Sequence, residues 1–397
     1  MKWRTMPLNA IKATVPYAFV GGPFGSNLTT RDYVQEGIPV IRGSNLPVDS
    51  LFREEDFVFV SEKKATDLRP NTAYPGDLIF TQRGTLGQVG LIPREAKYQR
   101  YIISQSQMKL TVNPKIAYAH FVYYLFRQPS MVQKVINCAI TSGVPHINLG
   151  ILKEFKIVLP EIDCQKRTAD ILSAYDNLID TNRRRIQLLE ESARLLFREW
   201  FVYFKFPNHE KVKIIKDGIG KTPEGWVKKK VVNVLKRVAP GELYDQATAK
   251  PTGGVPILDQ GQSGIIGYHN NEPSVIASLD DPIIVFANHT CNQRIIHFPF
   301  SAIQNIFPFL PSDENYRNIY WLHYATDNLV QLNAYKGHWP EFMAKNILLP
   351  PEDLCEKFGN IISLIHKQIF NISTQNQKLA QTRDLLLPRL MSGAIEV

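Results

Sequence analysis

The chain has few cysteines for its length, and they are scattered. Its 397 residues include only Cys138, Cys164, Cys291 and Cys355. No Cys-x-x-Cys or Cys-x-x-His spacing occurs, although structural zinc sites depend on such spacings and small secreted domains on dense cysteine frameworks. We therefore expect reduced, buried thiols and neither a metal site nor a disulfide framework.

Long apolar runs are also missing. No stretch approaches the ~20 residues that a membrane-spanning helix needs, and the N-terminal residues 1–19 lack the apolar core of a signal peptide. Hydrophobic residues make up 44% and aromatic residues 11% of the chain, as in ordinary folded proteins. The sequence predicts a cytoplasmic protein without a membrane partner, and its length predicts two or three compact units.

Motifs of nucleotide-binding and methyl-transferring enzymes are incomplete. Gly218–Thr222 ends like a phosphate-binding loop, but Ile215 occupies the place of its first glycine, and Pro223 follows where a helix should begin. Asp281–Ile283 lacks the second proline and the aromatic residue of the motif used by amino-methyltransferases. Since no nucleophile, base and orienting group form a recognisable set, we predict no catalytic residues in this chain.

Positive charge is concentrated in one part of the sequence. The formal net charge is +9. Residues 1–160 contain 19 Lys/Arg against 11 Asp/Glu, whereas residues 223–350 contain 10 against 11. A basic globular region is typical of proteins that bind a polyanion such as nucleic acid. The alternative is that the excess of charge only aids solubility.

The sequence repeats itself after 190 residues. Ile157–Pro160 matches Ile347–Pro350, and acidic residues that favour a helix N-terminus follow each segment. Two helical patterns of roughly forty residues come next, with apolar residues at alternating steps of three and four. This spacing is typical of the seam of a left-handed coiled coil, in which one asparagine per helix can fix the register. The alternative is that each helix packs only against its own globular core.

The predicted helix-pairing residues form one seam on each helix. They are Leu172, Tyr175, Ile179, Asn182, Ile186, Leu189 and Leu196 in the first helix, and Ile362, Ile365, Ile369, Ile372, Asn376, Leu379, Leu386 and Leu390 in the second. Pro388 is expected to kink or end the second helix because it has no backbone donor, and Gly393 is expected to provide the exit.

A weaker repeat links the globular parts. Gly37–Ile41 resembles Gly254–Leu258, and Gly76–Phe80 resembles Asp281–Val285, each typical of a short strand entered through a turn. We predict an α+β fold in which two mixed α/β domains are separated by two long antiparallel helices forming a coiled coil, with a pseudo-two-fold internal repeat. The predicted boundaries are 1–160 and 223–350 for the globular domains, 161–205 and 351–397 for the helices, and 206–222 for the connector.

Three stretches carry a resemblance to a known family. They are Pro223–Trp226 at the start of the second half, Leu195–Phe201 at the end of the first helix, and Leu385–Gly393 at the end of the second. With the duplicated order of globule and helix, they make the whole chain resemble the specificity subunits of type I restriction–modification systems. The resemblance implies two target-recognition domains, each reading one half of a bipartite double-stranded DNA target, with the paired helices setting the spacer.

The resemblance also implies partners that carry the chemistry. A specificity subunit is non-catalytic and recruits two modification subunits, which methylate adenine with S-adenosylmethionine, and through them restriction subunits that use ATP and Mg²⁺. We therefore expect no cofactor in this chain. Two alternatives stay open: a helical scaffold that joins two partner proteins without reading DNA, and a truncated or recombined specificity protein that serves as an exchange cassette.

Candidate DNA-binding residues are the polar side chains on predicted loops, because paired donors and acceptors read base edges. They are Arg42, Asn45, Gln82, Arg83, Thr85, Gln105 and His146 in the first domain, and Gln260, Gln262, Asn288, His289, Asn292, Arg294, Lys336 and His338 in the second. Since phosphate neutralisation supplies much of the affinity for DNA, the near-neutral second domain predicts that the modification subunits complete its basic groove.

Overall fold

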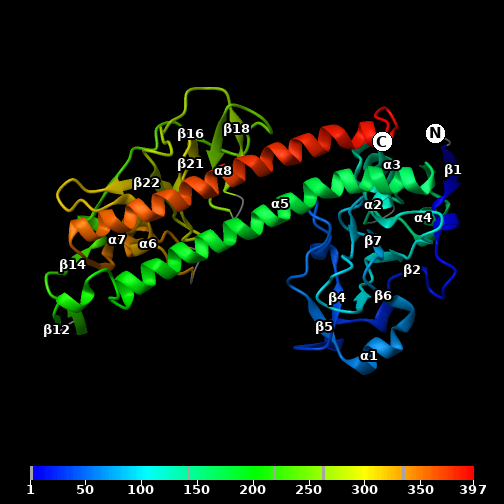
Figure 1. Cartoon of the computed structure of the whole chain (residues 1–397), viewed down its shortest axis with the longest axis horizontal. Coiled ribbons are helices and arrows are strands. Elements are labelled where there is room, and N and C mark those ends of the chain that lie inside the picture. Colours follow the sequence, from blue (N-terminus) through cyan, green and yellow to red (C-terminus); the bar gives the residue numbers. More distant parts are fainter. Residues whose placement is uncertain (1–2, 142–143, 218–219, 262–263, 333–335) are drawn as a thin grey trace. The chain divides into compact units, whose positions relative to one another are not determined.

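The chain forms two compact units, which we call unit 1 and unit 2. Unit 1 comprises Met1–Asn182 and Gln375–Val397, and unit 2 comprises Arg183–Thr374. Two long helices, α5 (Ile162–Phe197) and α8 (Glu352–Met391), each contribute to both units (Figure 1). The computed structural model describes residues 3–141, 144–217, 220–261, 264–332 and 336–397. No helix among them is long and apolar enough to span a membrane.

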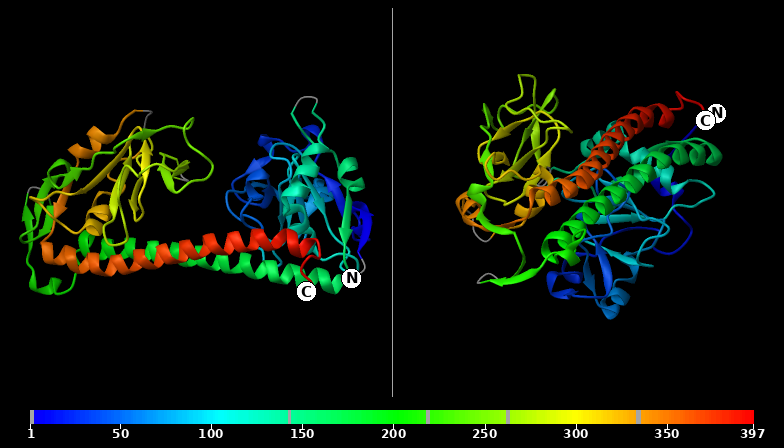
Figure 2. Two further views of the ribbon diagram at one scale, coloured as in Figure 1. Left: turned by 90° about the horizontal axis from the view of Figure 1, so that it is seen from above. Right: turned by 60° about the vertical axis from the view of Figure 1, so that its left-hand side comes forward.

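Unit 1 contains three sheets, with strands coloured mainly from blue to cyan in Figure 2. The first is antiparallel, in the order β2 (Phe19–Gly21), β10 (Gln107–Leu110), β7 (Leu78–Thr81) and β8 (Val89–Leu91). The second has the order β3 (Tyr33–Val34), β5 (Val58–Val60), β4 (Ile38–Ile41), β9 (Tyr101–Ile103) and β6 (Thr72–Ala73). In it β4 and β9 are parallel and the other pairs are antiparallel. The third pairs β1 (Arg4–Pro7) with β11 (Lys156–Leu159).

Unit 2 repeats this arrangement except at the edges of its second sheet. Its first sheet has the order β15 (Leu235–Arg237), β22 (Ile306–Pro311), β19 (Ile283–Ala287) and β20 (Gln293–Ile296). Its second has four strands, in the order β16 (Leu243–Tyr244), β21 (Ser301–Ile303), β17 (Val255–Leu258) and β18 (Ile265–His269). Both β16 and β17 are parallel to β21, whereas in unit 1 the edge strand β6 is antiparallel to β9. Its third pairs β14 (Val227–Lys230) with β23 (Asn346–Leu349). The predicted internal repeat is thus present in the strand order.

Short helices complete each unit. Unit 1 has α1 (Glu62–Asp67), α2 (Ala119–Arg127), α3 (Pro129–Asn137) and α4 (Leu149–Glu154), and unit 2 has α6 (Ile319–Thr326) and α7 (Trp339–Ala344). By their order, α6 corresponds to α2 and α7 to α4. A hairpin of β12 (Ile214–Asp217) and β13 (Gly220–Pro223) precedes β14.

Strand register fixes which residues of the two units correspond. Thr81 lies opposite Gln107, and Ala287 lies opposite Ile306. Phe80 therefore corresponds to Phe286, so the match of Gly76–Phe80 with Asp281–Val285 expected from the sequence is wrong by one residue. Short apolar strands resemble one another at several offsets, and only cross-strand pairing decides the register.

The long helices are built into both cores. Leu172 of α5 and Leu387 of α8 belong to the unit 1 core, together with Phe121 of α2. Ile362 of α8 belongs to the unit 2 core, together with Trp200, which follows α5 in a short π-helical turn. The beginning of α5 therefore packs with the end of α8 in unit 1, so the two helices are antiparallel, as predicted.

The predicted seam residues lie on the inner faces of these helices, since every one of them is buried or half-buried. The two seam asparagines bond to each other: Asn182 Nδ2 donates to Asn376 Oδ1 at 2.9 Å, and Asn376 Nδ2 donates to the Ile179 carbonyl at 3.3 Å. A shift of either helix along the other would break this pairing and place an amide against apolar side chains, so the asparagines favour one register.

Pro388 does not end α8, which continues to Met391. The expectation of an end at the proline is wrong because burial opposes it: Leu390 and Met391 are 3% and 4% exposed in the unit 1 core. Proline removes one helical hydrogen bond, and burying two large side chains outweighs that cost. The helix exits at Gly393, whose φ of +75° lies in the left-handed region that glycine favours.

Candidate nucleic-acid interface

In unit 1 the predicted DNA-binding residues gather at one edge of the sheets. Because β4 and β9 are parallel, the loops that follow them, Arg42–Asn45 and Ser104–Ser106, begin at the same edge. The turn after β7 joins them, since the Gln82 N–H donates to the Ser106 carbonyl at 2.7 Å. His146 completes the group through a backbone bridge to Arg83. Loops far apart in sequence thus form one polar edge.

A pocket of about 350 Å³ opens at this edge. We call it the Arg42 pocket; its lining residues are Leu28, Thr29, Thr30, Tyr33, Arg42, Ser104, Gln105 and Ser106. Arg42 Nη2 donates to the Asp56 carbonyl at 2.7 Å, which fixes the plane of the guanidinium group. Gln105 Nε2 donates to the Leu28 carbonyl at 2.7 Å and holds the rim together.

Unit 2 builds the same junction from corresponding loops. The Asn288 N–H donates to the Asn305 carbonyl at 2.9 Å, as Gln82 does to Ser106. Gln260 Oε1 accepts from the His289 N–H at 2.8 Å. The His289 ring nitrogen Nδ1 lies 3.0 Å from the Lys336 carbonyl. The loops after β17, β19 and β21 and the segment before α7 are therefore joined by hydrogen bonds.

Three of the predicted DNA-binding residues are buried, and two of them bond to the loops through their side chains. Asn45 is 0% exposed and donates from Nδ2 to the carbonyls of Arg53 and Glu55 at 3.1 and 3.0 Å. Asn288 is 8% exposed, and its Oδ1 accepts from the Trp339 N–H at 2.8 Å. His338 is 0% exposed. Side chains enclosed in this way cannot reach a base edge, and the hydrogen bonds of Asn45 and Asn288 give these two residues a role in positioning loops.

The remaining candidates differ in exposure. Arg83, Thr85, Gln105, Asn292 and Lys336 are exposed, and Arg42, Gln82, His146, Gln260, His289 and Arg294 are half-buried. Gln262 lies outside the described residues. Arg294 is drawn inward, with Nη2 donating to the Asp259 carbonyl at 2.7 Å, and burial lowers its pKa despite the opposing charge of Asp259. DNA contact by the accessible residues stays a prediction.

Sequence reasoning missed a buried ion pair between the long helices of unit 1. Arg383 Nη1 lies 2.5 Å from Asp176 Oδ1, and their side chains are 9% and 4% exposed. Tyr124 donates to the other carboxylate oxygen of Asp176 at 2.6 Å. Burial opposes the charge of Arg383, but hydrogen bonds and charges from Asp176 and Asp384 outweigh it and raise its pKa. The sequence signal that could have revealed this ion pair is Arg383 itself, a charged residue at a position of the apolar seam.

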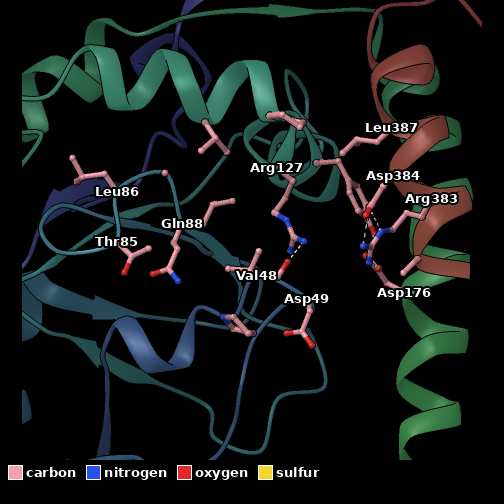
Figure 3. A pocket seen from close by; sticks show the side chains of 17 residues that line it. Val48, Asp49, Thr85, Leu86, Gln88, Arg127, Asp176, Arg383, Asp384 and Leu387 are labelled. Carbon is pink, nitrogen blue, oxygen red and sulfur yellow. Dashed lines mark hydrogen bonds and ion pairs between the residues drawn. The ribbon is translucent and has the colours of Figure 1, made fainter. Parts of the chain in front are cut away.

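This ion pair lines a second pocket of unit 1, of about 580 Å³ (Figure 3). Figure 3 shows Arg383 directed toward Asp176, with Arg127 on the opposite wall. Arg127 donates to Tyr123 Oη at 2.5 Å and to the Val48 carbonyl. The two arginines that line this pocket, Arg127 and Arg383, are thus already bonded to other groups of the chain.

Unit 2 places different chemistry at the corresponding joint. With the 190-residue shift, His366 takes the place of Asp176, and Ala193, 0% exposed, takes the place of Arg383. Tyr324 of α6, the counterpart of Tyr124, has its hydroxyl 3.3 Å from His366 Nε2. The tyrosine contact between short and long helix is kept, while the ion pair is replaced by a neutral side chain.

His366 lies among two further histidines. The ring centroids of His297 and His323 are 5.3 and 6.4 Å from that of His366. Burial lowers the pKa of His297 and of His323 to about 4, and burial with the two neighbouring rings lowers that of His366 to about 3. Among the described residues, no His, Cys, Asp and Glu side chains are arranged to hold a metal ion.

Comparison with known proteins relates the chain to one family. The family described as Type I restriction modification DNA specificity domain matches residues 32–191. The type I restriction enzyme MjaIX specificity subunit of Methanocaldococcus jannaschii is 24% identical over 363 residues, covering 85% of this chain and 82% of that protein. The chain is thus similar to the specificity subunits of type I restriction–modification systems over most of its length.

Further members resemble the chain over nearly its whole length. The putative MjaX specificity subunit of the same organism is 26% identical over 385 residues, covering 91% of this chain and 88% of that protein. The crystal structure of the S subunit from M. genitalium matches with a TM-score of 0.58 at 14% identity, covering 98% of this chain and 96% of that one. At this identity the likeness concerns the fold, and it agrees with the architecture predicted from the sequence.

Proposed function

We propose that the chain is the DNA sequence-recognition subunit of a type I restriction–modification complex, each unit reading one half of a bipartite double-stranded target. The observation that carries this proposal is the duplicated polar edge. In both units the loops after β4, β7 and β9, or their counterparts β17, β19 and β21, meet at one edge with accessible polar side chains. Two similar readers in one chain suit a target of two parts.

In this proposal the chain itself catalyses no reaction. Methylation of adenine and cleavage belong to modification and restriction subunits, which bring S-adenosylmethionine, ATP and Mg²⁺. The incomplete nucleotide and methyl-transfer motifs of this sequence support that assignment. We place the assembled complex in the cytoplasm, where the DNA is.

A second row of apolar residues on the long helices supports two copies of the modification subunit. Ile171 and Ile361 are 36% and 41% exposed, and Leu195 and Leu385 are 49% and 69% exposed. Each pair is 190 residues apart, so the row recurs in the two repeats. Unit 1 contains Ile171 and Leu385, and unit 2 contains Leu195 and Ile361.

Other exposed apolar side chains extend the same rows. Leu178 and Leu188 on α5 are 40% and 45% exposed, and Leu364 on α8 is 64% exposed. On α5, residues 171 and 178, and residues 188 and 195, are seven apart, the spacing at which a further helix packs. Exposed apolar rows of this kind mark protein interfaces. We assign one modification subunit to the row of each unit.

The test is the methylation pattern of a cell that expresses the modification subunit. With this gene present, sequencing of methylated bases should reveal one bipartite motif containing methyladenine in each half. Deleting the gene should erase that motif and leave all others. An unchanged pattern, with the modification subunit demonstrably expressed, would contradict the proposal and favour a scaffold that does not read DNA.

A further inference from the structure

Two arginines at the polar edge of unit 1 lie in different settings. Arg42 is half-buried in its pocket, with one guanidinium nitrogen bonded to the Asp56 carbonyl. Arg83 is exposed, and its side chain makes no hydrogen bond or ion pair with any described residue. The backbone bond from Gln82 to Ser106, a residue that lines the Arg42 pocket, places the Arg83 turn beside that pocket.

The chemistry of the Arg42 pocket suits a phosphate group. Arg42 is the one charged residue in its lining, and Thr30, Tyr33 and Ser104 bring hydroxyl groups. Asp32, adjacent to the lining, is bound to Lys64 by a 2.9 Å ion pair. A guanidinium group held in one plane, together with several hydroxyl donors, commonly binds phosphate oxygens.

The setting of Arg83 suits a base edge instead. Its turn is held at the backbone, because the Gln82 N–H donates to Ser106 and the Gln82 carbonyl accepts from Ile147 at 3.1 Å. A rigid turn that presents an uncommitted guanidinium group can place it against O6 and N7 of guanine, the commonest specific contact of arginine with DNA.

Unit 2 lacks both arginines at the corresponding places. Ile41 pairs with Ile103 and Leu258 pairs with Ala302, so Arg42 corresponds to Asp259 and Ser104 to Ile303. Arg83 corresponds to His289, which follows Asn288 as Arg83 follows Gln82. A carboxylate and an isoleucine replace the arginine and a hydroxyl group, and this exchange removes the features that suit phosphate.

We propose a division of labour in unit 1: the Arg42 pocket binds a backbone phosphate of the first half-site, and Arg83 reads a guanine in that half-site. Unit 2 reads its half-site without this pair. The inference rests on the proposed function and adds to it which residue positions the DNA and which one selects sequence.

The experiment measures DNA binding by the complex assembled with its modification subunits. The probe is a duplex with the bipartite motif found by methylation sequencing, alongside duplexes with single base-pair changes in each half. Arg42→Gln should weaken binding to all duplexes by a similar factor, about tenfold, and should lower the slope of log affinity against log salt by about 1. Arg42→Lys keeps the charge and should retain the slope.

Arg83→Gln should give a different signature. Discrimination at one G·C pair of the first half-site should fall by roughly 10- to 100-fold, while every preference in the second half-site is retained. Arg94→Gln is the matched control and should change neither quantity, because Arg94 is exposed and follows β8 at the opposite end of the sheet from Gln82. Thermal unfolding of each variant verifies that the fold is intact.

Several results would overturn the division of labour. They are a changed base preference in Arg42→Gln with an unchanged salt slope, a uniform loss of affinity in Arg83→Gln, or no effect of either substitution in a folded complex. A wild-type complex that shows no preference for any bipartite duplex would instead contradict the proposed function itself, so the two failures are distinguishable.

Discussion

Units 1 and 2 share the order of most of their strands but hold the long helices with different chemistry. In unit 1, Tyr124 donates to Asp176, which forms a buried ion pair with Arg383. In unit 2, Tyr324 contacts His366, a neutral base. The comparison teaches that the apolar pattern and the tyrosine keep the joint in place, while the polar group beneath is free to vary. The two units should therefore respond differently to mutation and to pH.

The largest expected effect is loss of the unit 1 ion pair. Asp176→Ala leaves Arg383 charged and buried without its main partner, which should cost roughly 3–5 kcal/mol of unfolding free energy. The combination Asp176→His with Arg383→Ala copies the joint of unit 2 and should cost clearly less than Asp176→Ala alone. Urea unfolding of the full chain measures both.

Asp163→Ala is the control for that series, because Asp163 forms an exposed ion pair with Lys166 in the first turn of α5. Its loss should cost at most about 1 kcal/mol. If the copied joint proves as destabilising as Asp176→Ala, the two joints are not interchangeable, and the comparison between the units fails at this position.

An intermediate effect is expected when the exposed apolar rows are disrupted, because these rows are proposed to bind the modification subunits. Leu385→Glu in unit 1 and Leu195→Glu in unit 2 place a charge at corresponding points of the exposed apolar rows. Each should weaken one modification-subunit contact by about 2–3 kcal/mol, the scale of one buried leucine, so each complex should retain one copy and the double variant none. Native mass spectrometry measures the stoichiometry.

Gln377→Glu, an exposed change on α8 that is turned away from Leu385, is the control for assembly and should leave two copies bound. Loss of both copies from either single variant would show that the two units do not dock partners independently.

The smallest effect concerns pH. The pKa values of His297 and His323, about 4, and of His366, about 3, lie below the ordinary value near 6.5. The unfolded chain therefore binds protons that the folded one does not. The contribution of these neutral histidines to the free energy of unfolding is therefore complete above about pH 6.5 and is lost as the pH falls towards 4. Between pH 7 and 5.5 the wild-type chain should lose roughly 1 kcal/mol more of its unfolding free energy than the His366→Gln variant does.

Hydrogen exchange, corrected for intrinsic rates, reports the pH effect locally. At pH 5.5 the amides of α6 should lose more protection than those of α2 in unit 1, which contains His120 as a single histidine with a pKa lowered by burial. Equal losses in α2 and α6 would assign the acid sensitivity to the whole chain rather than to the histidine joint.

The sequence predicted the repeating features well because they depend on local pattern. The heptad spacing alone indicated α5 and α8, and the proline-closed segments indicated β11 and β23. Asn182 and Asn376 were recognisable as a seam pair for the same reason. Such patterns report which face of an element is buried without reference to the rest of the chain.

Features that depend on distant contacts escaped the sequence. Arg383 meets a partner 207 residues away on another helix, and no local spacing reveals it. Asn45, Asn288 and His338 have the residue types of DNA readers and lie in loops, yet all three are buried. Whether a polar loop residue turns outward or inward is decided by the packing of several segments at once, which composition does not record.

The division of α5 and α8 between the units has a consequence for the order in which the chain folds during synthesis. Unit 2 is continuous in sequence, Arg183–Thr374, whereas unit 1 needs Gln375–Val397 to complete its core. A ribosome therefore synthesises every residue of unit 2 before the last helix turns of unit 1. Leu387, Leu390 and Met391 close a core whose first strand emerged hundreds of residues earlier. Unit 1, whose synthesis begins first, therefore completes its core last.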